Sequence, residues 1–432
     1  QIIPRHGPGA TADKLTGNRK YNQTEWTERL DVLFPFGEYA LPNLRHHQDV
    51  VPGVTFLEPG AERPVRVITV PKTLKTPRII AIEPTCMQYV QQGIMAAIVP
   101  RLESRFIRTP HGLERNNAFG LTGFTDQEPN QLLAQEGSLT GDLATLDLSE
   151  ASDRVSNQLV REMLRTFPNL AAGVDACRSR KADVPGHGVI RLAKFASMGS
   201  ALTFPIEAIV FSTLAVMGIA EALNVPVSVR LLSQLSGRVR VYGDDIIVPA
   251  DHAERVVAKL ESFGFRVNAS KSFWNGKFRE SCGKEYYAGD DVSIVKVRRM
   301  LPTQLAHTEE IVSTVSLRNQ FYMLGMWQTA AHLDKMLERV LNGHYPVVGP
   351  DSPALGRWSL SFGYETQRSH PHLHSPLVKA YVVRAKKRSS ALDGIPALLK
   401  CLLKQGDEPF ADSEHLLYGG RPETVNIKLR WT

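Results

Sequence analysis

The feature that most restricts the fold is a Gly-Asp-Asp sequence at residues 243–245, which lies between two short apolar segments. Val239–Val248 as a whole has the pattern of two strands joined by a tight turn, which predicts a β-hairpin. Within a strand, successive side chains point to opposite faces, so two adjacent aspartates would not normally serve one site. At a turn this alternation breaks, and Asp244 and Asp245 can then point to the same place. A solvated turn is the alternative interpretation of such a pair taken alone.

The segments around this hairpin alternate between strand-like and helix-like patterns. Leu143–Leu148 is a short apolar strand, and Asp153–Phe167 carries apolar residues at helical spacing. An apolar helix is predicted at Leu202–Leu223, and a further helix and strand follow the hairpin up to residue 268. This order predicts an α+β layer, with antiparallel strands on one side and helices on the other.

The flanking regions are predicted in less detail. Strands are expected at Val65–Val70 and Ile79–Ile82, followed by a helix at Thr85–Ile98. The chain is expected to be mainly helical from Thr308 to about Asn342, and its last ninety residues to mix loops and helices. None of these regions carries an internal repeat, so a repeat architecture is not expected.

The composition sets broad limits on the class of protein. Of the 432 residues 43% are hydrophobic, which is ample for a large buried core, and the formal net charge is +7. Such a basic surplus is expected in a protein that binds a polyanion, and a basic surface without a partner is the alternative. The four cysteines form no C-x-x-C pair, so neither a zinc site nor a disulfide framework is expected, and a reducing cytosol fits.

Neither a membrane span nor a signal peptide is expected. The longest apolar stretch, Ala208–Ala220, is shorter than a bilayer span and is interpreted as a buried helix. The sequence starts at Gln1 without a methionine, which predicts a processed or partial chain.

Aspartates at the ends of strands are the side chains expected to bind magnesium. Asp147 lies at the end of one predicted strand, and Asp244 and Asp245 lie at the tip of the hairpin. Magnesium prefers hard carboxylate ligands. Two such ions about 3.5–4 Å apart activate the attacking oxygen in phosphoryl transfer and neutralise the charge that develops. These aspartates are therefore the candidate metal ligands and catalytic residues.

Further patterns accompany these aspartates in a fixed order. Asp147-x5-Asp153, Ser197-x-Gly199-x3-Thr203, Tyr242-Gly-Asp-Asp245 and Lys271 resemble polymerase motifs A, B, C and D. The sequences around these motifs resemble the replicase catalytic (beta) subunit of leviviruses, the positive-strand RNA bacteriophages. They are TLDLSEASDRVS, FASMGSALTFPIEAIVF, VYGDDIIVP and FRESCG. PRIIAIEPTCMQYVQQG at 77–93 resembles motif F of that family. The resemblance covers roughly residues 65–300 well and the flanks weakly.

The resemblance implies an α+β right-hand polymerase fold with fingers, thumb and a palm, whose antiparallel sheet is backed by helices. Fingers are expected at 1–140 and 159–195, palm at 141–158 and 196–300, and thumb with the C-terminal region at 301–432. Family members usually have a longer region before motif F, so an N-terminal segment is expected to be missing from this chain.

The resemblance also implies an activity and its partners. The activity would be RNA-directed RNA polymerisation that replicates a phage genome by two-metal nucleotidyl transfer, with de novo initiation. The expected cofactor is Mg²⁺, as two ions, with Mn²⁺ as a substitute. The expected partners are an RNA template and product, ribonucleoside triphosphates, host elongation factors Tu and Ts, and a ribosomal RNA-binding protein. The expected location is the cytoplasm of the infected bacterium, without a membrane.

Individual residues receive roles from the same resemblance. Asp147 and Asp244 match the main metal ligands, and Asp245 supports the second ion or orients the ligands. Asp153 and Thr203 match residues that sense the ribose 2′ hydroxyl, the group that distinguishes RNA from DNA. A helix N-cap is the alternative for Asp153. Many related polymerases carry Asn four residues beyond the motif B threonine. This chain has Glu207 there, as the phage family does, so a different orientation of Asp153 is expected.

The other matched residues keep two interpretations each. Lys271 matches a general acid that protonates pyrophosphate, or is a surface lysine. Gly199 permits close backbone approach to template or nucleotide, with Ser197 assisting, or belongs to a turn at the start of a helix. Three basic residues match fingertip residues over the triphosphate, or belong to a solvated basic loop. They are Lys72, Lys75 and Arg78.

Three remaining features and two other functions complete the sequence hypotheses. The histidines of His370–His374 are not favoured as a metal site, because no Cys or carboxylate lies close in sequence. Arg298–Arg299 and Arg384–Arg388 are interpreted either as phosphate contacts or as surface. A reverse transcriptase shares the palm and an aspartate pair, but Gly243 and Thr203 argue against it. A catalytically inactive RNA-binding relative would have lost a metal aspartate, and all three are present.

Overall fold

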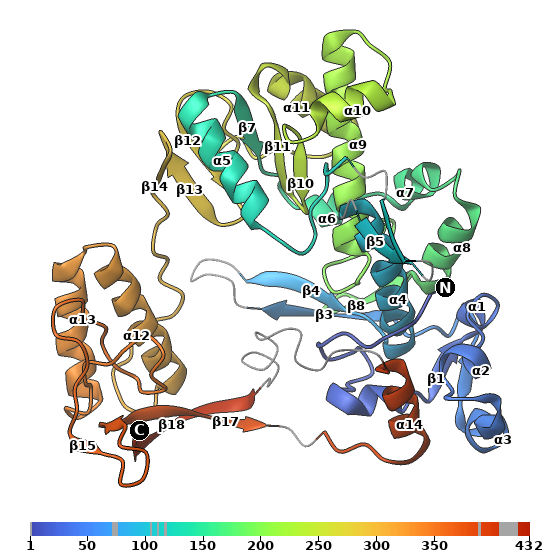
Figure 1. Ribbon diagram of the computed structural model, residues 1–432. Helices are drawn as coiled ribbons and strands as arrows, with labels where there is room; N and C mark the ends of the chain where they lie inside the picture. The colour runs from blue at the N-terminus through green and yellow to red at the C-terminus, as the bar shows by residue number, and fades with distance from the viewer. Residues whose placement is uncertain are drawn as a thin grey trace. The chain divides into compact units, whose positions relative to one another are not determined.

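The computed structural model describes residues 2–70, 77–103, 106–109, 112–115, 119–387, 390–405 and 422–432. Of residues 106–109, 112–115, 386–387 and 422–424, only the backbone is described. The chain forms two compact units (Figure 1). The first unit consists of Gln1–Thr69, Ile79–Ser293 and Ser390–Gln405, and the second of Val70–Arg78, Ile294–Ser389 and Gly406–Thr432.

A three-stranded antiparallel sheet holds the candidate aspartates in the first unit. Its strands, in the order β10-β11-β7, are Arg240–Tyr242, Asp245–Pro249 and Leu143–Leu146. Tyr242 pairs with Asp245, which leaves Gly243 and Asp244 as a two-residue turn, and Ile246 pairs with Leu146. One step further along that register lie Asp245 and Asp147, so the sheet brings these two aspartates to adjacent positions. The predicted hairpin and the strand before it are confirmed.

Helix α9 (Thr203–Leu223) is the long buried helix of this unit, where an apolar helix was expected. It packs against α11 (Ala253–Ser262) and lies beside β10 and β11 (Figure 1). With 21 residues and a mean hydropathy of 1.8, α9 is long and apolar enough to cross a membrane, so the expectation that this stretch is too short is wrong. Its most apolar window is 67% buried inside the protein, which supports a core helix instead.

A second hairpin, β12 (Phe278–Ser281) and β13 (Lys284–Tyr287), is joined to β7 by a buried arginine. Arg279 is fully buried, and its Nε donates to the carbonyl of Leu143 at 2.6 Å. Its Nη1 donates to backbone carbonyls of the segment that forms the hairpin. Backbone oxygens, rather than a carboxylate, therefore accept the hydrogen bonds of this cation. Burial lowers the pKa of Arg279. The arginine therefore fixes the position of the hairpin relative to the sheet.

A four-stranded sheet contacts the segment before α9. Its order is β4-β3-β8-β9, formed by Arg78–Ile82, Val65–Val70, Lys181–Val184 and Gly188–Arg191. The backbone N–H of Ala81 donates to the carbonyl of Met198 at 2.7 Å, which ties β4 to that segment. The two predicted strands are confirmed here. Helix α4 (Thr85–Glu103) begins where predicted and extends beyond the expected end at Ile98.

The single helix predicted at Asp153–Phe167 is wrong. The chain forms α6 (Ala151–Arg154) and α7 (Asn157–Met163), separated by extended backbone at Val155. The Ser156 side chain accepts a hydrogen bond from Leu159 N at 3.1 Å and so caps α7. A serine cap satisfies backbone donors at a helix start, which makes a break here favourable. Asp153 lies inside α6, so its interpretation as an N-cap is also wrong.

The second unit is built from two helices and a two-stranded ribbon. These are α12 (Thr308–Met323), α13 (Trp327–Val340), β17 (Lys379–Lys387) and β18 (Pro422–Trp431). The helices confirm the helical region predicted there, and Arg318 on α12 forms a bidentate ion pair with Asp334 on α13 at 2.7 and 2.8 Å. The core cluster of this unit includes Ile311, Leu337, Leu341, Tyr345 and Tyr381.

Among the remaining elements, α5 (Glu128–Thr140) packs against β7, β12 and β13. The other α-helices are α1 (Glu28–Asp31), α2 (Phe36–Tyr39), α3 (His47–Val50), α8 (Pro168–Cys177), α10 (Val229–Leu235) and α14 (Gly394–Leu403). The 3-10 helices are η1 (Gly17–Tyr21), η2 (Leu44–His46), η3 (Val51–Gly53) and η4 (Ala250–His252). The strands are β1 (Glu25–Thr27), β2 (Thr55–Leu57), β5 (Phe106–Thr109), β6 (Gly112–Arg115), β14 (Asp290–Asp291), β15 (Arg368–Ser369) and β16 (Pro376–Leu377).

Candidate active site

Asp147 follows β7 and is held by the segment after α11. The Nδ2 of Asn268 donates to Oδ2 of Asp147 at 3.0 Å, and Asn268 N donates to its carbonyl at 2.9 Å. The Oγ of Ser272 accepts from Asp147 N at 3.0 Å. Burial raises the pKa of the Asp147 carboxyl, while Lys271 and the Asn268 hydrogen bond lower it. Asp244 contributes a further increase, so the two carboxylates are close enough to repel each other.

Asp244 and Asp245 occupy the tip of the β10–β11 hairpin in different environments. Gly243 takes φ +61 at the first turn position, a conformation that favours glycine, and a Cβ there would lie 2.5 Å from the Phe204 ring. Asp244 is exposed. Asp245 accepts at Oδ1 from Cys282 N at 3.0 Å and from Ser281 Oγ at 3.3 Å, both in the turn of the second hairpin.

Burial is the main reason that the pKa of Asp245 rises to about 6. The hydrogen bond from Cys282 N lowers this pKa, and the charges of Asp244 and Asp147 raise it. The register places Asp147 beside Asp245, which follows Asp244 in the chain, and the like charges of these residues carry an electrostatic cost. A divalent cation would remove that cost by neutralising the mutual repulsion.

The donor set fits magnesium, since all its members are carboxylates at the end of a sheet. The described part of the chain, however, contains no group of three or more His, Cys, Asp or Glu side chains assembled closely enough to hold a metal ion. The strand register thus brings Asp147 near Asp244 and Asp245, but the three side chains do not form a complete coordination shell. The assignment of metal ligands remains a proposal.

Lys271 lies beside this group on the same segment as Asn268. Its side chain is 52% exposed, and its Nζ is 4.0 Å from Oε1 of Glu280. It is also the neighbouring cation that lowers the pKa of Asp147. A proton donor to the leaving group must lie near the carboxylates, as Lys271 does. Its exposure also fits a surface lysine without a catalytic role. Both interpretations of Lys271 stay open.

The segment from Ser197 to Thr203 is folded tightly against β4. The Thr203 hydroxyl donates to the carbonyl of Ser197 at 2.9 Å, and both residues are buried. Gly199 has φ +127, and a Cβ there would lie 1.9 Å from the carbonyl oxygen of Ala81. Gly199 therefore permits a close approach of the protein's own strand β4. The expected approach to template or nucleotide stays a prediction.

Asp153 forms an ion pair that its sequence position did not predict. Lys194 Nζ lies 2.5 Å from Oδ1 of Asp153, and the aspartate is half exposed. After burial, the charges of Asp244 and Asp153 both raise the pKa of Glu207. The ion pair gives Asp153 a partner within the protein, and its role towards the ribose stays a prediction. No hydrogen bond joins Asp153 to Thr203 among the described residues.

Glu207 is the most strongly perturbed carboxyl near the site. It is 8% exposed, and burial, then Asp244, then Asp153 raise its pKa to about 8. Because this pKa lies above the ordinary value of 4.5, the folded protein keeps the proton longer than the unfolded chain does. The stability contributed by this proton is fully present below pH 4.5 and is lost as the pH rises through 8.

Replacing Glu207 with Gln is therefore expected to stabilise the protein at alkaline pH only. The amide imitates the protonated carboxyl, so the variant should match the unmodified protein near about pH 5 and exceed it by up to ~3 kcal/mol near about pH 9. Denaturant unfolding at both pH values measures this difference in free energy. A difference that does not change with pH would contradict the assigned electrostatics.

The basic residues expected over the triphosphate are placed only in part. Lys72 and Lys75 lie outside the described residues. Arg78 begins β4 with an exposed side chain, three residues before the Ala81 that contacts the Gly199 loop. Glu83, which follows β4, is buried and accepts from Ser179 Oγ at 2.5 Å, and burial raises its pKa to about 7. Burial and the Ser179 contact fix the Glu83 side chain in the interior.

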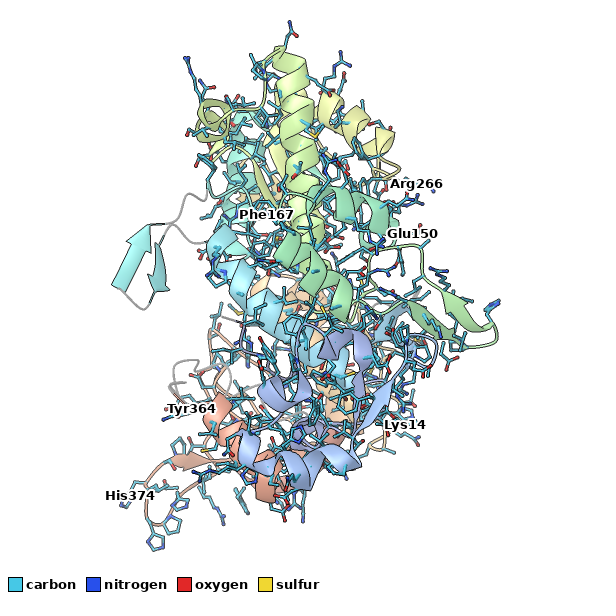
Figure 2. All side chains as sticks on the ribbon, turned by 90° about the vertical axis from the view of Figure 1, so that its right-hand side faces the viewer. Lys14, Glu150, Phe167, Arg266, Tyr364 and His374 are labelled. Atoms are coloured by element: carbon cyan, nitrogen blue, oxygen red, sulfur yellow. The ribbon has the colours of Figure 1, made fainter. Side chains whose placement is uncertain are left out.

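The other sequence features lie in the second unit. His374 projects from the loop between β15 and β16 (Figure 2). His370 Nδ1 accepts from the backbone N–H groups of His372 and Leu373, at 3.2 and 3.1 Å, which shapes this exposed loop. Arg299 pairs with Glu309 at 2.6 Å, whereas Arg298 and Arg384 are exposed. Arg388 lies outside the described residues, and phosphate contacts of these arginines remain a prediction.

Two groups of residues were not found from the sequence. Asn268 and the Ser281–Cys282 turn both hydrogen-bond to candidate metal ligands. Asn268 stands three residues before Lys271, and Ser281 and Cys282 lie within the quoted FRESCG sequence. Their neighbourhood was therefore visible, but the contacts span 121 and 37 residues along the chain. Such long-range pairs have no local pattern.

Comparison with known proteins shows the family of the chain. Residues 61–327 match the family described as "RNA replicase, beta-chain", so the chain belongs to that family. It is 37% identical over 236 residues to the RNA-directed RNA polymerase subunit beta of Qbeta virus (strain MX1), a match that covers 55% of this chain and 36% of the relative. It is 36% identical over 382 residues to the corresponding subunit of Enterobacteria phage SP, covering 85% of this chain and 60% of the relative.

Both matches leave a large part of the relatives uncovered. The chain spans little more than a third of the first relative's length and 60% of the second's. Among solved structures, the RNA-dependent RNA polymerase of a human picorbirnavirus is 11% identical over 59% of this chain and 52% of its own, with a TM-score of 0.40. That likeness is too weak to assign the fold.

Proposed function

We propose that this chain is the catalytic core of an RNA-directed RNA polymerase that replicates a single-stranded RNA phage genome by two-metal nucleotidyl transfer. The observation that carries the proposal is the β7–β11 register, which places Asp147 beside Asp245 at the tip of the hairpin. Membership of the replicase family supports the reaction class. Asp147, Asp244 and Asp245 would hold Mg²⁺, or Mn²⁺ in its place. Bound divalent ions supply activation of the attacking hydroxyl and neutralisation of phosphate charge.

The protein's own groups would recognise the substrates. Asp153 and Thr203 would sense the ribose 2′ hydroxyl, with Lys194 released from Asp153 or retained as part of the contact. Ser197 and Gly199 would shape the loop that faces template and nucleotide. Lys72, Lys75 and Arg78 would bind the triphosphate, because a guanidinium grips phosphate in bidentate fashion and ammonium groups act as point charges.

The architecture that goes with this activity is a right hand. Fingers would comprise 1–140 and 159–195, palm 141–158 and 196–300, and thumb with the C-terminal region 301–432. The three-stranded sheet with α9 and α11 supports the palm assignment. Initiation would be de novo, in the cytoplasm of an infected bacterium. Host elongation factors Tu and Ts and a ribosomal RNA-binding protein would complete the replicase.

Lys271 would donate a proton to the leaving pyrophosphate. Replacing it with Leu is expected to slow single-nucleotide incorporation by ~10²-fold or more, the usual contribution of a general acid. Lys277→Leu is the matched control, because Lys277 is also exposed and lies six residues further along. Rapid-quench kinetics at saturating nucleotide measures the step. An unchanged elongation rate in Lys271→Leu would remove the acid role.

The direct test of the function is synthesis from an RNA template with four ribonucleotides and Mg²⁺, with and without bacterial lysate. The proposal expects template-dependent RNA that disappears when the metal is chelated. A parallel reaction with deoxyribonucleotides separates a reverse transcriptase, which would make DNA instead. Absence of any product from a folded chain in both arms would favour an inactive RNA-binding relative.

A further inference from the structure

Two of the candidate metal ligands have one carboxylate oxygen already engaged by the protein. Oδ2 of Asp147 accepts from Asn268 Nδ2 at 3.0 Å. Oδ1 of Asp245 accepts from Cys282 N at 3.0 Å and from Ser281 Oγ at 3.3 Å. The hydrogen bonds of the described residues thus leave one oxygen of each carboxylate for another ligand. The donors reach these aspartates from two different segments, one after α11 and one in the β12–β13 turn.

Asn268 is itself fixed at three points. Its backbone N–H donates to the carbonyl of Asp147 at 2.9 Å, and its own carbonyl accepts from Lys271 N at 3.0 Å. Its side-chain Oδ1 accepts from Ser270 Oγ at 2.8 Å. A carboxylate can only accept, so the amide must present Nδ2 to Asp147, and the Ser270 contact favours that same orientation. The amide is therefore oriented before any substrate or cation arrives.

The chemistry of the donor matters as much as its position. A lysine that formed a direct ion pair with Asp147 would place a positive charge where a cation has to bind. An amide is a neutral donor, so it restricts the carboxylate without repelling the cation.

We propose that Asn268 is a positioning residue that fixes the Asp147 carboxylate with Oδ1 left to coordinate a divalent cation. This inference rests on the proposed function, because it assumes that Asp147 is a metal ligand. Residues that orient ligands from outside the coordination shell typically change metal affinity by ~10–100-fold when they are removed. Because the side chain of Asn268 donates to Asp147, its loss should act through metal affinity rather than through the chemical step.

The test compares Asn268→Ala with Asn169→Ala, an exposed asparagine on α8 that makes no side-chain hydrogen bond among the described residues. Mn²⁺ binding to the chain, without RNA or nucleotide, is followed by the electron paramagnetic resonance signal of free Mn²⁺. Asn268→Ala is expected to weaken binding at least ~10-fold, and Asn169→Ala to leave it unchanged. In RNA synthesis, Asn268→Ala should raise the half-saturating Mg²⁺ concentration by a similar factor, while saturating Mg²⁺ largely restores the rate.

Combination with Asp147→Ala distinguishes a local role from a general loss of structure. If Asn268 acts through Asp147, adding Asn268→Ala to Asp147→Ala produces no further loss of Mn²⁺ binding, since the interaction is already gone. A further loss of the same factor would overturn the inference. If Asn268→Ala does not fold, Ser270→Ala replaces it and is expected to weaken Mn²⁺ binding by a smaller factor, while unchanged binding in that variant would overturn the inference.

The two levels of the proposal fail in different ways. If the unmodified chain binds no Mn²⁺, or if Asp147→Ala binds it as well as the unmodified chain does, the metal assignment under the proposed function is wrong. If Asp147→Ala loses binding but Asn268→Ala behaves like Asn169→Ala, the proposed function stands and the positioning role of Asn268 is wrong.

Discussion

Replacing Asp244 with Ala is expected to reduce RNA synthesis at least ~10³-fold, because a metal ligand contributes several kcal/mol to transition-state stabilisation. The same change should leave RNA binding nearly intact, since affinity for RNA depends mainly on basic groups that contact phosphates. The fold should tolerate it, because Asp244 is exposed at the turn. Its charge also raises the pKa of Asp147, Asp245 and Glu207, so its removal relieves repulsion.

Asp251→Ala is the matched control for this prediction. Asp251 is an exposed aspartate just beyond the other end of β11 and makes no described side-chain hydrogen bond. Primer extension and filter binding on the same preparations separate synthesis from RNA affinity. Extension by Asp244→Ala at a rate close to that of Asp251→Ala would remove Asp244 from the metal site. Loss of RNA binding in parallel with synthesis would point to a misfolded hairpin instead.

Replacing Gly199 with Ala is expected to destabilise the protein by more than ~3 kcal/mol. A Cβ at this position would lie 1.9 Å from the carbonyl oxygen of Ala81, a distance that requires β4 or the loop to move. The backbone angle of +127° adds strain of its own, because side chains other than glycine disfavour positive φ by ~1–2 kcal/mol. A rotamer change cannot relieve the overlap of the added Cβ with a backbone oxygen. The substitution therefore has to disrupt the contact between the loop and β4.

Gly186→Ala isolates the backbone strain from the overlap. Gly186 lies between β8 and β9 with φ +80, and an added Cβ there meets nothing within 4 Å. It should therefore lose only the ~1–2 kcal/mol of conformational strain. Denaturant unfolding of both variants gives the difference directly. Equal losses of unfolding free energy in the two variants would show that β4 does not contact the Gly199 loop in solution. That result would contradict the contact between these segments.

Local patterns were sufficient for the elements that carry the aspartates. The hairpin was predictable because Gly243 and two apolar flanks specify a tight turn without any distant contact. The strand before Asp147 and the helix α9 were also visible, since runs of buried apolar residues identify them. The adjacency of Asp147 and Asp245 required the register between two strands about a hundred residues apart, which no local pattern contains.

The rest of the site depends on pairings between distant segments. Asp153 was expected either to cap a helix or to contact sugar, and its partner Lys194 lies 41 residues away. Ser156 broke the helix predicted after Asp153, because a local cap outweighed the apolar spacing. In the second unit, the ribbon of β17 and β18 was missed because its strands are joined through a long connection. The strand β18 itself alternates apolar and polar residues from Val425 to Trp431, a strand pattern that was visible in the sequence.

Anomalous X-ray diffraction from crystals grown with Mn²⁺, an RNA template and an unreactive ribonucleotide analogue tests the central claim most directly. Convergence of the three aspartates on divalent cations predicts a Mn²⁺ peak about 2.1 Å from a carboxylate oxygen of Asp147 and from one at the hairpin tip. A peak that is confined to other residues, or an Asp147 carboxyl turned away from an occupied metal position, would contradict the account.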